Sequence, residues 1–102
     1  METLKKVTEI HYNQNDVEKF IPLDIQANNG ADILMVAKGQ EQGVVLCLWD
    51  RDEYVTWMIY RHDNWKYANS GNYFRWGGHT ERSKKEAFKA AKEDFFERCK
   101  RI

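Results

Sequence analysis

Three apolar runs separated by short polar breaks occupy the middle of the chain. They cover residues 32–38, 43–49 and 53–62, and the breaks at 39–42 and 50–52 are four and three residues long. Gaps of this size suit β-hairpins, whereas parallel strands need a crossover of about a dozen residues. The pattern therefore predicts an antiparallel β-meander.

The third run, EYVTWMIYRH, alternates between two faces that are both largely apolar. One face presents Val55, Trp57 and Ile59, and the other presents Tyr54, Thr56, Met58 and Tyr60. Successive side chains of a strand point to opposite sides of a sheet. We therefore expect a central strand, buried on one side and partly covered on the other.

A further strand is expected in WKYANSGNYFRW, residues 65–76, after a turn at 62–64. Its pattern is interrupted near Asn69, Ser70 and Gly71. A glycine within a strand pattern is typical of a bulge or a loop. Which of the aromatic rings in this segment point outward is left open by the sequence.

The last segment carries the clearest helical signal. Residues 83–86, SKKE, fit a capping box, in which the Ser83 hydroxyl accepts from the Glu86 amide and the Glu86 carboxylate accepts from the Ser83 amide. From there to the last residue there is no glycine or proline. The pattern therefore predicts a helix that begins after Ser83.

Apolar residues recur along this helix at steps of three and four, which gives one apolar stripe. The stripe consists of Phe88, Ala91, Phe95, Cys99 and Ile102, widened by Ala87 and Phe96. Asp94 with Arg98, and Glu97 with Arg101, form pairs of opposite charge spaced i,i+4. We expect the stripe to pack against one face of the sheet.

The N-terminal third gives weaker signals. Residues 3–12 alternate in part and could form a first strand, while Asn15 or Asp16 could cap a helical turn that Pro22 ends. Whether residues 1–30 are strand or helix is left open.

The whole pattern predicts an α+β fold in a single domain, 1–102: an antiparallel β-meander of four to five strands with a C-terminal α-helix packed on one face.

Charge is balanced overall but uneven along the chain. The net charge is zero, yet residues 1–60 carry five basic and ten acidic side chains, and residues 61–102 carry eleven basic and six acidic ones. The basic surplus either covers the solvent-facing side of the helix or forms a functional basic patch.

A chain of 102 residues can bury a core without disulfides or metals.

The expected location is cytoplasmic. Cys47 and Cys99 both fall among apolar residues, which favours two buried thiols over a disulfide and fits a reducing compartment. The first residues lack the continuous apolar run of a signal peptide. No stretch approaches the ~20 apolar residues of a membrane helix.

Patterns typical of catalysis or metal binding are not found in the sequence. His11, His62 and His79 have no histidine or cysteine at i,i+3 or i,i+4, as a local zinc site would require. The acidic turn at 50–53 lacks the spacing of a calcium loop, and GNYFRWGG lacks that of a phosphate loop. We expect no enzymatic activity, no catalytic residue, no metal and no cofactor.

Aromatic and basic residues are concentrated between positions 57 and 82. Some of these rings are needed to pack against the helix, and the others could bind a protein, as interface tyrosine, tryptophan and arginine do, or stack on the bases of a nucleic acid. The candidate partner-binding residues are Arg61, Trp65, Tyr67, Arg75, Trp76, His79 and Arg82.

The C-terminal half resembles small uncharacterised proteins of phages and other mobile elements in bacteria. The resemblance covers YVTWMIYRHDNWKYANSGNYFRW followed by EAFKAAKEDFFER. The matching residues are Trp57, Gly71, Tyr73, Phe74, Ala90 or Ala91, Asp94, Phe95 and Arg98. It implies an accessory protein that binds another protein, host defence nucleases included, or nucleic acid, and it supplies no active-site residue.

The sequence thus leads to two hypotheses. The first is a small binding protein without enzymatic activity, an accessory or counter-defence factor of a phage or mobile element that acts on a protein partner. The alternative is a nucleic-acid-binding module that uses residues 61–82 and the basic helix face. An edge strand could also pair with a second copy and form a homodimer with two-fold symmetry.

Overall fold

Strands that follow one another in the sequence are neighbours in the sheet. The structure, a computed structural model, describes residues 9–11, 31–49, 52–77 and 82–102. The sheet is antiparallel and has the order β1-β2-β3-β4-β5. Its strands are β1 (Glu9–His11), β2 (Asp32–Lys38), β3 (Gln42–Trp49), β4 (Glu53–Tyr60) and β5 (Asn69–Arg75).

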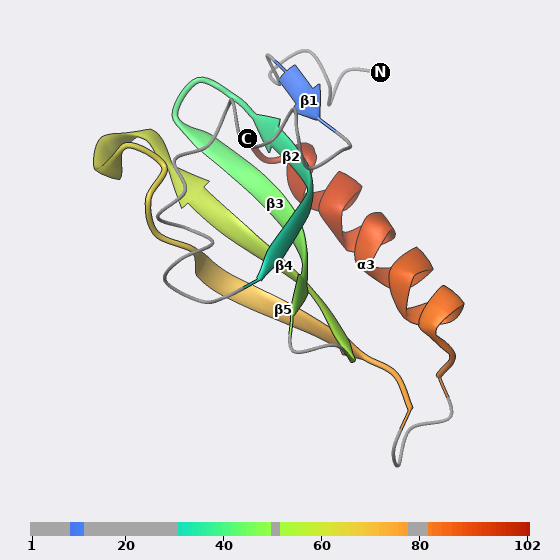
Figure 1. The fold of residues 1–102 in the computed structure, drawn as a ribbon. Helices are drawn as coiled ribbons and strands as arrows, with labels where there is room; N and C mark the ends of the chain where they lie inside the picture. The colour runs from blue at the N-terminus through green and yellow to red at the C-terminus, as the bar shows by residue number, and fades with distance from the viewer. Residues whose placement is uncertain (1–8, 12–30, 50–51, 78–81) are drawn as a thin grey trace.

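One helix, α3 (Lys84–Cys99), lies across one face of this sheet (Figure 1). The predicted α+β fold, an antiparallel meander with a C-terminal helix on one face, is therefore confirmed. Within the described residues, no helix is long and apolar enough to cross a membrane. β1 lies inside the expected strand at 3–12, whereas the proposed helical turn before Pro22 falls outside the described residues.

Strand boundaries follow the sequence pattern closely, with two exceptions. β5 begins at Asn69 rather than at residue 65, because residues 65–68 are not part of the strand. β4 ends at Tyr60 rather than at residue 62, because a 3-10 turn, η2 (Arg61–Asp63), follows it. Asn64 ends this turn in the left-handed conformation at φ 60°, and the Trp65 amide donates back to the Tyr60 carbonyl at 3.0 Å. The chain is thereby turned back toward β5.

Gly43 of β3 has no room for a side chain between its neighbours on β2 and β4. A side chain at Gly43 would place its Cβ 2.8 Å from the Ala37 carbonyl oxygen and 3.0 Å from Cγ1 of Ile59. Contacts this short are not tolerated between packed atoms. Gly43 therefore permits the Ile59 side chain to close over the strand beside it.

The two faces of β4 divide as the alternation predicts. Val55, Trp57 and Ile59 are buried on the face away from α3, and Tyr54 and Thr56 are buried on the face that α3 covers. β2 departs from simple alternation, because its register with β3 shifts between Ile33 and Met35. As a result, the consecutive residues Leu34 and Met35 both contribute to the core under α3, while Ile33 and Val36 lie in the core on the other face.

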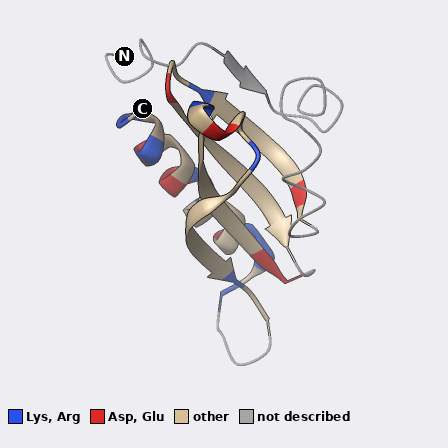
Figure 2. Cartoon of the chain, turned by 90° about the vertical axis from the view of Figure 1, so that its left-hand side faces the viewer, with Lys and Arg blue, Asp and Glu red and all other residues tan. Residues whose placement is uncertain are grey.

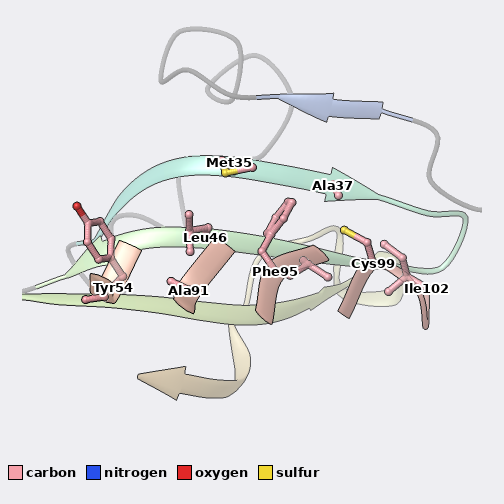
Figure 3. Packing of buried hydrophobic residues seen from close by; sticks show 10 residues of the cluster. Met35, Ala37, Leu46, Tyr54, Ala91, Phe95, Cys99 and Ile102 are labelled. Atoms are coloured by element: carbon pink, nitrogen blue, oxygen red, sulfur yellow. The ribbon is translucent and has the colours of Figure 1, made fainter. Parts of the chain in front are cut away.

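The core between α3 and the sheet is built around Phe95, which is fully buried. In Figure 3 its ring points toward the strands between Leu46 and Ala37, and Cys99 lies beside Ile102. The capping box forms as predicted, with the Ser83 hydroxyl accepting from the Glu86 amide at 3.1 Å. The stripe of small and large apolar residues is therefore what holds the helix to the sheet.

The expected stripe was wrong at one position. Phe96 is 37% exposed, whereas Arg98 is buried at 7% exposure. Successive residues of an α-helix are turned by about 100°, so Phe96 points away when Phe95 faces the sheet. Arg98, three residues after Phe95, returns to the buried side.

Truncation of Phe95 tests this packing. Phe95→Ala is expected to lower the free energy of unfolding by about 3–5 kcal/mol, because it leaves a cavity in the fully buried core. Phe96→Ala removes the same ring from an exposed position and is expected to cost less than about 1 kcal/mol. Urea unfolding of both variants measures the difference. Equal losses would contradict the assignment of the buried face.

Candidate partner-binding surface

The predicted contact residues that precede β5 have different environments. Arg61 is exposed, and its Nη1 donates to the Gln40 carbonyl at 3.1 Å. Trp65 is only 9% exposed, with φ 61°, and the Lys38 ammonium lies 4.4 Å from its ring centroid. Tyr67 is 57% exposed. Tyr67 and Arg61 can therefore reach a partner, whereas Trp65 belongs to the core on the face away from α3.

The predicted contact residues that follow β5 lie at the opposite end of that strand. Arg75 is exposed, with its Nε 3.6 Å from Oδ2 of Asp52. Trp76 is half-buried, and its ring packs 4.9 Å from the ring of Tyr54 on the α3 side of the sheet. Arg82 is exposed.

The seven predicted residues are therefore not brought together as one surface. The strand between the two groups has seven residues and spans about 20 Å. His79 lies outside the described residues. Trp65 and Trp76, moreover, lie on opposite faces of the sheet.

Tyr73 is the exposed ring in the middle of the strand. It is 51% exposed, and its ring centroid lies 6.0 Å from that of Trp49 and 6.3 Å from that of Trp57. The sequence placed Tyr73 in the aromatic cluster but not among the contact residues. Its pairing with Val55 shows that it lies on the face away from α3, information that requires the strand register.

Gly71 makes this ring arrangement possible. A Cβ at this position would lie 2.6 Å from Nε1 of Trp57 and 2.8 Å from the Tyr73 hydroxyl oxygen. Both rings therefore rest against bare backbone. The interruption predicted near Asn69–Gly71 is confirmed, because Ser70 has φ 56° and the register with β4 shifts between Thr56 and Met58.

β5 is the last strand in the sheet order and presents an edge with little charge. In Figure 2 the strands of the sheet are drawn mainly in tan, which marks uncharged residues, with few segments in blue or red. Residues 69–74 contain no charged side chain, and most of β5 is exposed. We call Tyr67, Tyr73 and the β5 edge the tyrosine edge. It combines exposed rings with backbone groups suitable for pairing.

A polar network ties β5 and β4 to α3. The Asp94 carboxylate accepts hydrogen bonds from the Thr56 hydroxyl, from Nδ2 of Asn72 at 3.1 Å and from Nε of Arg98 at 3.2 Å. Nη2 of Arg98 donates to the Ser70 carbonyl at 2.6 Å. The network therefore joins one residue of β4 and two of β5 to one face of the helix.

The network also sets the ionisation of Asp94. Burial alone would raise its pKa, but the hydrogen bonds from Thr56 and Asn72 and the charge of Arg98 outweigh burial and lower the pKa from 3.8. The expected Asp94–Arg98 pair is confirmed, as a partly buried pair rather than a surface one. Glu97 pairs with Lys100 at 3.2 Å, in place of the expected partner Arg101.

The described residues offer no arrangement that suggests metal binding or nucleophilic catalysis. No group of three or more histidine, cysteine or acidic side chains converges among them. Cys47 and Cys99 are free and buried, as predicted. Burial raises the pKa of both thiols, that of Cys99 to about 11, so neither is a thiolate at neutral pH.

Replacement of Asp94 tests the network through its pH dependence. Asp94→Asn is expected to lower the free energy of unfolding by about 2 kcal/mol near neutral pH, because it removes the charged acceptor of three donors. The folded pKa is lowered, so this contribution is complete above the unfolded pKa and is lost as the pH falls through the folded pKa.

Urea unfolding of both proteins at several pH values measures this change. The stability gap between wild type and Asp94→Asn should narrow as the pH falls below about 4. Glu93→Gln removes the same charge from the neighbouring exposed position and serves as the control. A gap of constant size across the acid range would contradict the role assigned to the Asp94 charge.

Comparison with known proteins does not indicate a function for this chain. No protein-family model matches the chain, and neither the curated proteins nor the solved structures contain a match to it.

Proposed function

We propose that this chain is a binding protein without enzymatic activity, which engages a protein partner through the tyrosine edge. The observation that carries the proposal is the exposure of Tyr67 at 57% and of Tyr73 at 51%, one just before and one within an edge strand. Tyrosine gives a large contact area at a low cost in conformational entropy and is enriched at binding hot spots.

The backbone of β5 supports the same proposal. Edge strands commonly carry lysine, proline or inward-pointing charges that prevent pairing with another chain. β5 carries only the irregularity at Ser70 and a single charge at Arg75. A strand of the partner could pair with residues 71–74, while its side chains contact the Tyr73 ring.

Nucleic-acid binding is the alternative, and the local cations support it less well. Stacked bases need cations nearby to contact the phosphates. Arg75 lies beside the Asp52 carboxylate, and Arg61 already donates to the Gln40 carbonyl. On the exposed part of α3, basic and acidic residues are interleaved, as in Lys85, Glu86 and Lys89.

A biological setting is proposed from the C-terminal resemblance alone. The Trp- and Tyr-rich hairpin and the short helix that follows resemble accessory proteins of phages and mobile elements. In that setting the partner would be a cytoplasmic host protein, such as a defence nuclease, and the chain would be a counter-defence factor.

Affinity capture with matched variants tests the tyrosine edge. Immobilised wild-type chain is expected to enrich a bacterial protein at micromolar concentration, and Tyr67→Ala and Tyr73→Ala should each reduce that enrichment about tenfold. Phe96→Ala is the control, because it removes an exposed ring from α3 instead. Quantitative mass spectrometry measures the recovery. A partner captured equally by all variants would rule out the tyrosine edge as its binding surface.

Two solution measurements separate the other occupants of this surface. Titration of a fluorescent single-stranded oligonucleotide should show weak or no binding, whereas binding that falls steeply with added salt would favour the alternative. Sedimentation of the chain alone reports self-association. A homodimer that Tyr73→Ala dissociates would identify a second copy as the occupant.

A further inference from the structure

A polar hollow of about 260 Å³ lies beside the last turn of α3, on the face of the sheet that the helix covers. Gln42 of β3, Met58 of β4, Ser70 of β5 and the side chains of Arg98 and Arg101 line it. Neither tyrosine of the tyrosine edge belongs to this lining, although Ser70 is part of β5. The hollow therefore adjoins the proposed partner surface at Ser70 but does not involve its exposed rings.

Arg98 is fixed in place but keeps donor capacity. Its side chain is 9% exposed, with Nε donating to Asp94 at 3.2 Å and Nη2 to the Ser70 carbonyl at 2.6 Å. A guanidinium has five N–H donors. Its Nη1 has no hydrogen-bond partner among the described residues. Arg98 is thus held in one position beside the hollow, and its Nη1 group remains available as a hydrogen-bond donor.

The backbone around the hollow is arranged to hold this arginine. Ser70 adopts φ 56°, a left-handed conformation that non-glycine residues seldom take. In this conformation its carbonyl oxygen accepts the bond from Arg98. Non-glycine residues in this region persist where the surrounding structure holds them, often at binding sites.

The charged side chains at the hollow carry an excess of positive charge, which the negative end of the α3 dipole offsets in part. Arg98 and Arg101 are three residues apart at the end of the helix, and both line the same space. The Asp94 carboxylate balances one of the two guanidinium charges. Arg101 makes no side-chain ion pair among the described residues, and the Gln42 amide adds a neutral donor to the lining.

We propose that this hollow binds an anionic oxygen group, a carboxylate or a phosphate. The planar guanidinium fork matches two oxygens of either group, and charge-assisted hydrogen bonds of this kind are short and strong. Nη1 of Arg98 and the Arg101 guanidinium contact the anion, and the Gln42 amide donates from the strand side. The inference does not rest on the identity of the partner at the tyrosine edge.

The test is a titration of the full chain followed by NMR of the arginine side-chain Nε–H groups. Inorganic phosphate and acetate are the two probes, each added at constant ionic strength. Saturable shifts of Arg98 and Arg101 are expected, and Arg101→Gln should weaken binding about tenfold. Lys85→Gln removes the same charge from the first turn of α3 and should leave the affinity unchanged.

The pattern of affinities across these proteins either supports or overturns the anion site. Saturation in wild type and Lys85→Gln, with weaker binding in Arg101→Gln, supports the site, and the tighter probe identifies the chemical class of its ligand. Gln42→Ala supplies a second variant and should weaken binding without a change of net charge. Shifts that do not saturate, or equal affinities in all four proteins, would overturn the proposal.

Discussion

The position of β5 depends on one carboxylate, that of Asp94. The pairing of β5 with β4 is irregular at the start of β5, so the backbone hydrogen bonds between the two strands are interrupted there. Asp94 adds side-chain bonds from Thr56 and Asn72, and its partner Arg98 adds a bond to the backbone of β5. Because the tyrosine edge and the polar hollow are both built on β5, both depend on this link between strand and helix.

Most of the fold could be predicted because local patterns and tertiary packing agree. The alternation in β4, the short breaks between strands and the capping box at Ser83 are each satisfied in the structure. The feature that could not be predicted is the burial of Trp65, which depends on the backbone conformation of individual residues. Two successive left-handed residues, Asn64 and Trp65, turn Trp65 into the core on the face away from α3, and no alternation rule anticipates this.

The candidate site was predicted in part for similar reasons. Composition identified the aromatic segment, and Tyr67 proved to be exposed, but the assignment of residues to faces requires the register of β5. Arg98 was expected as the i,i+4 partner of Asp94, but the pairing rule does not say whether such a pair is buried. The signal that could have located it is its position three residues after Phe95, on the buried side of α3 and within reach of Asp94.

The bare backbone at Gly71 has an optical consequence. It allows Trp57 to lie close to Tyr73, while Trp49 contacts Trp57 with ring centroids 6.0 Å apart at 65°. Aromatic chromophores this close and tilted couple their electronic transitions, so this trio contributes to the near-ultraviolet circular dichroism of the chain. Since Tyr73 is half exposed, any molecule that settles on the edge changes the polarity around the trio. The protein therefore carries an intrinsic, label-free spectroscopic reporter at the surface where binding is proposed.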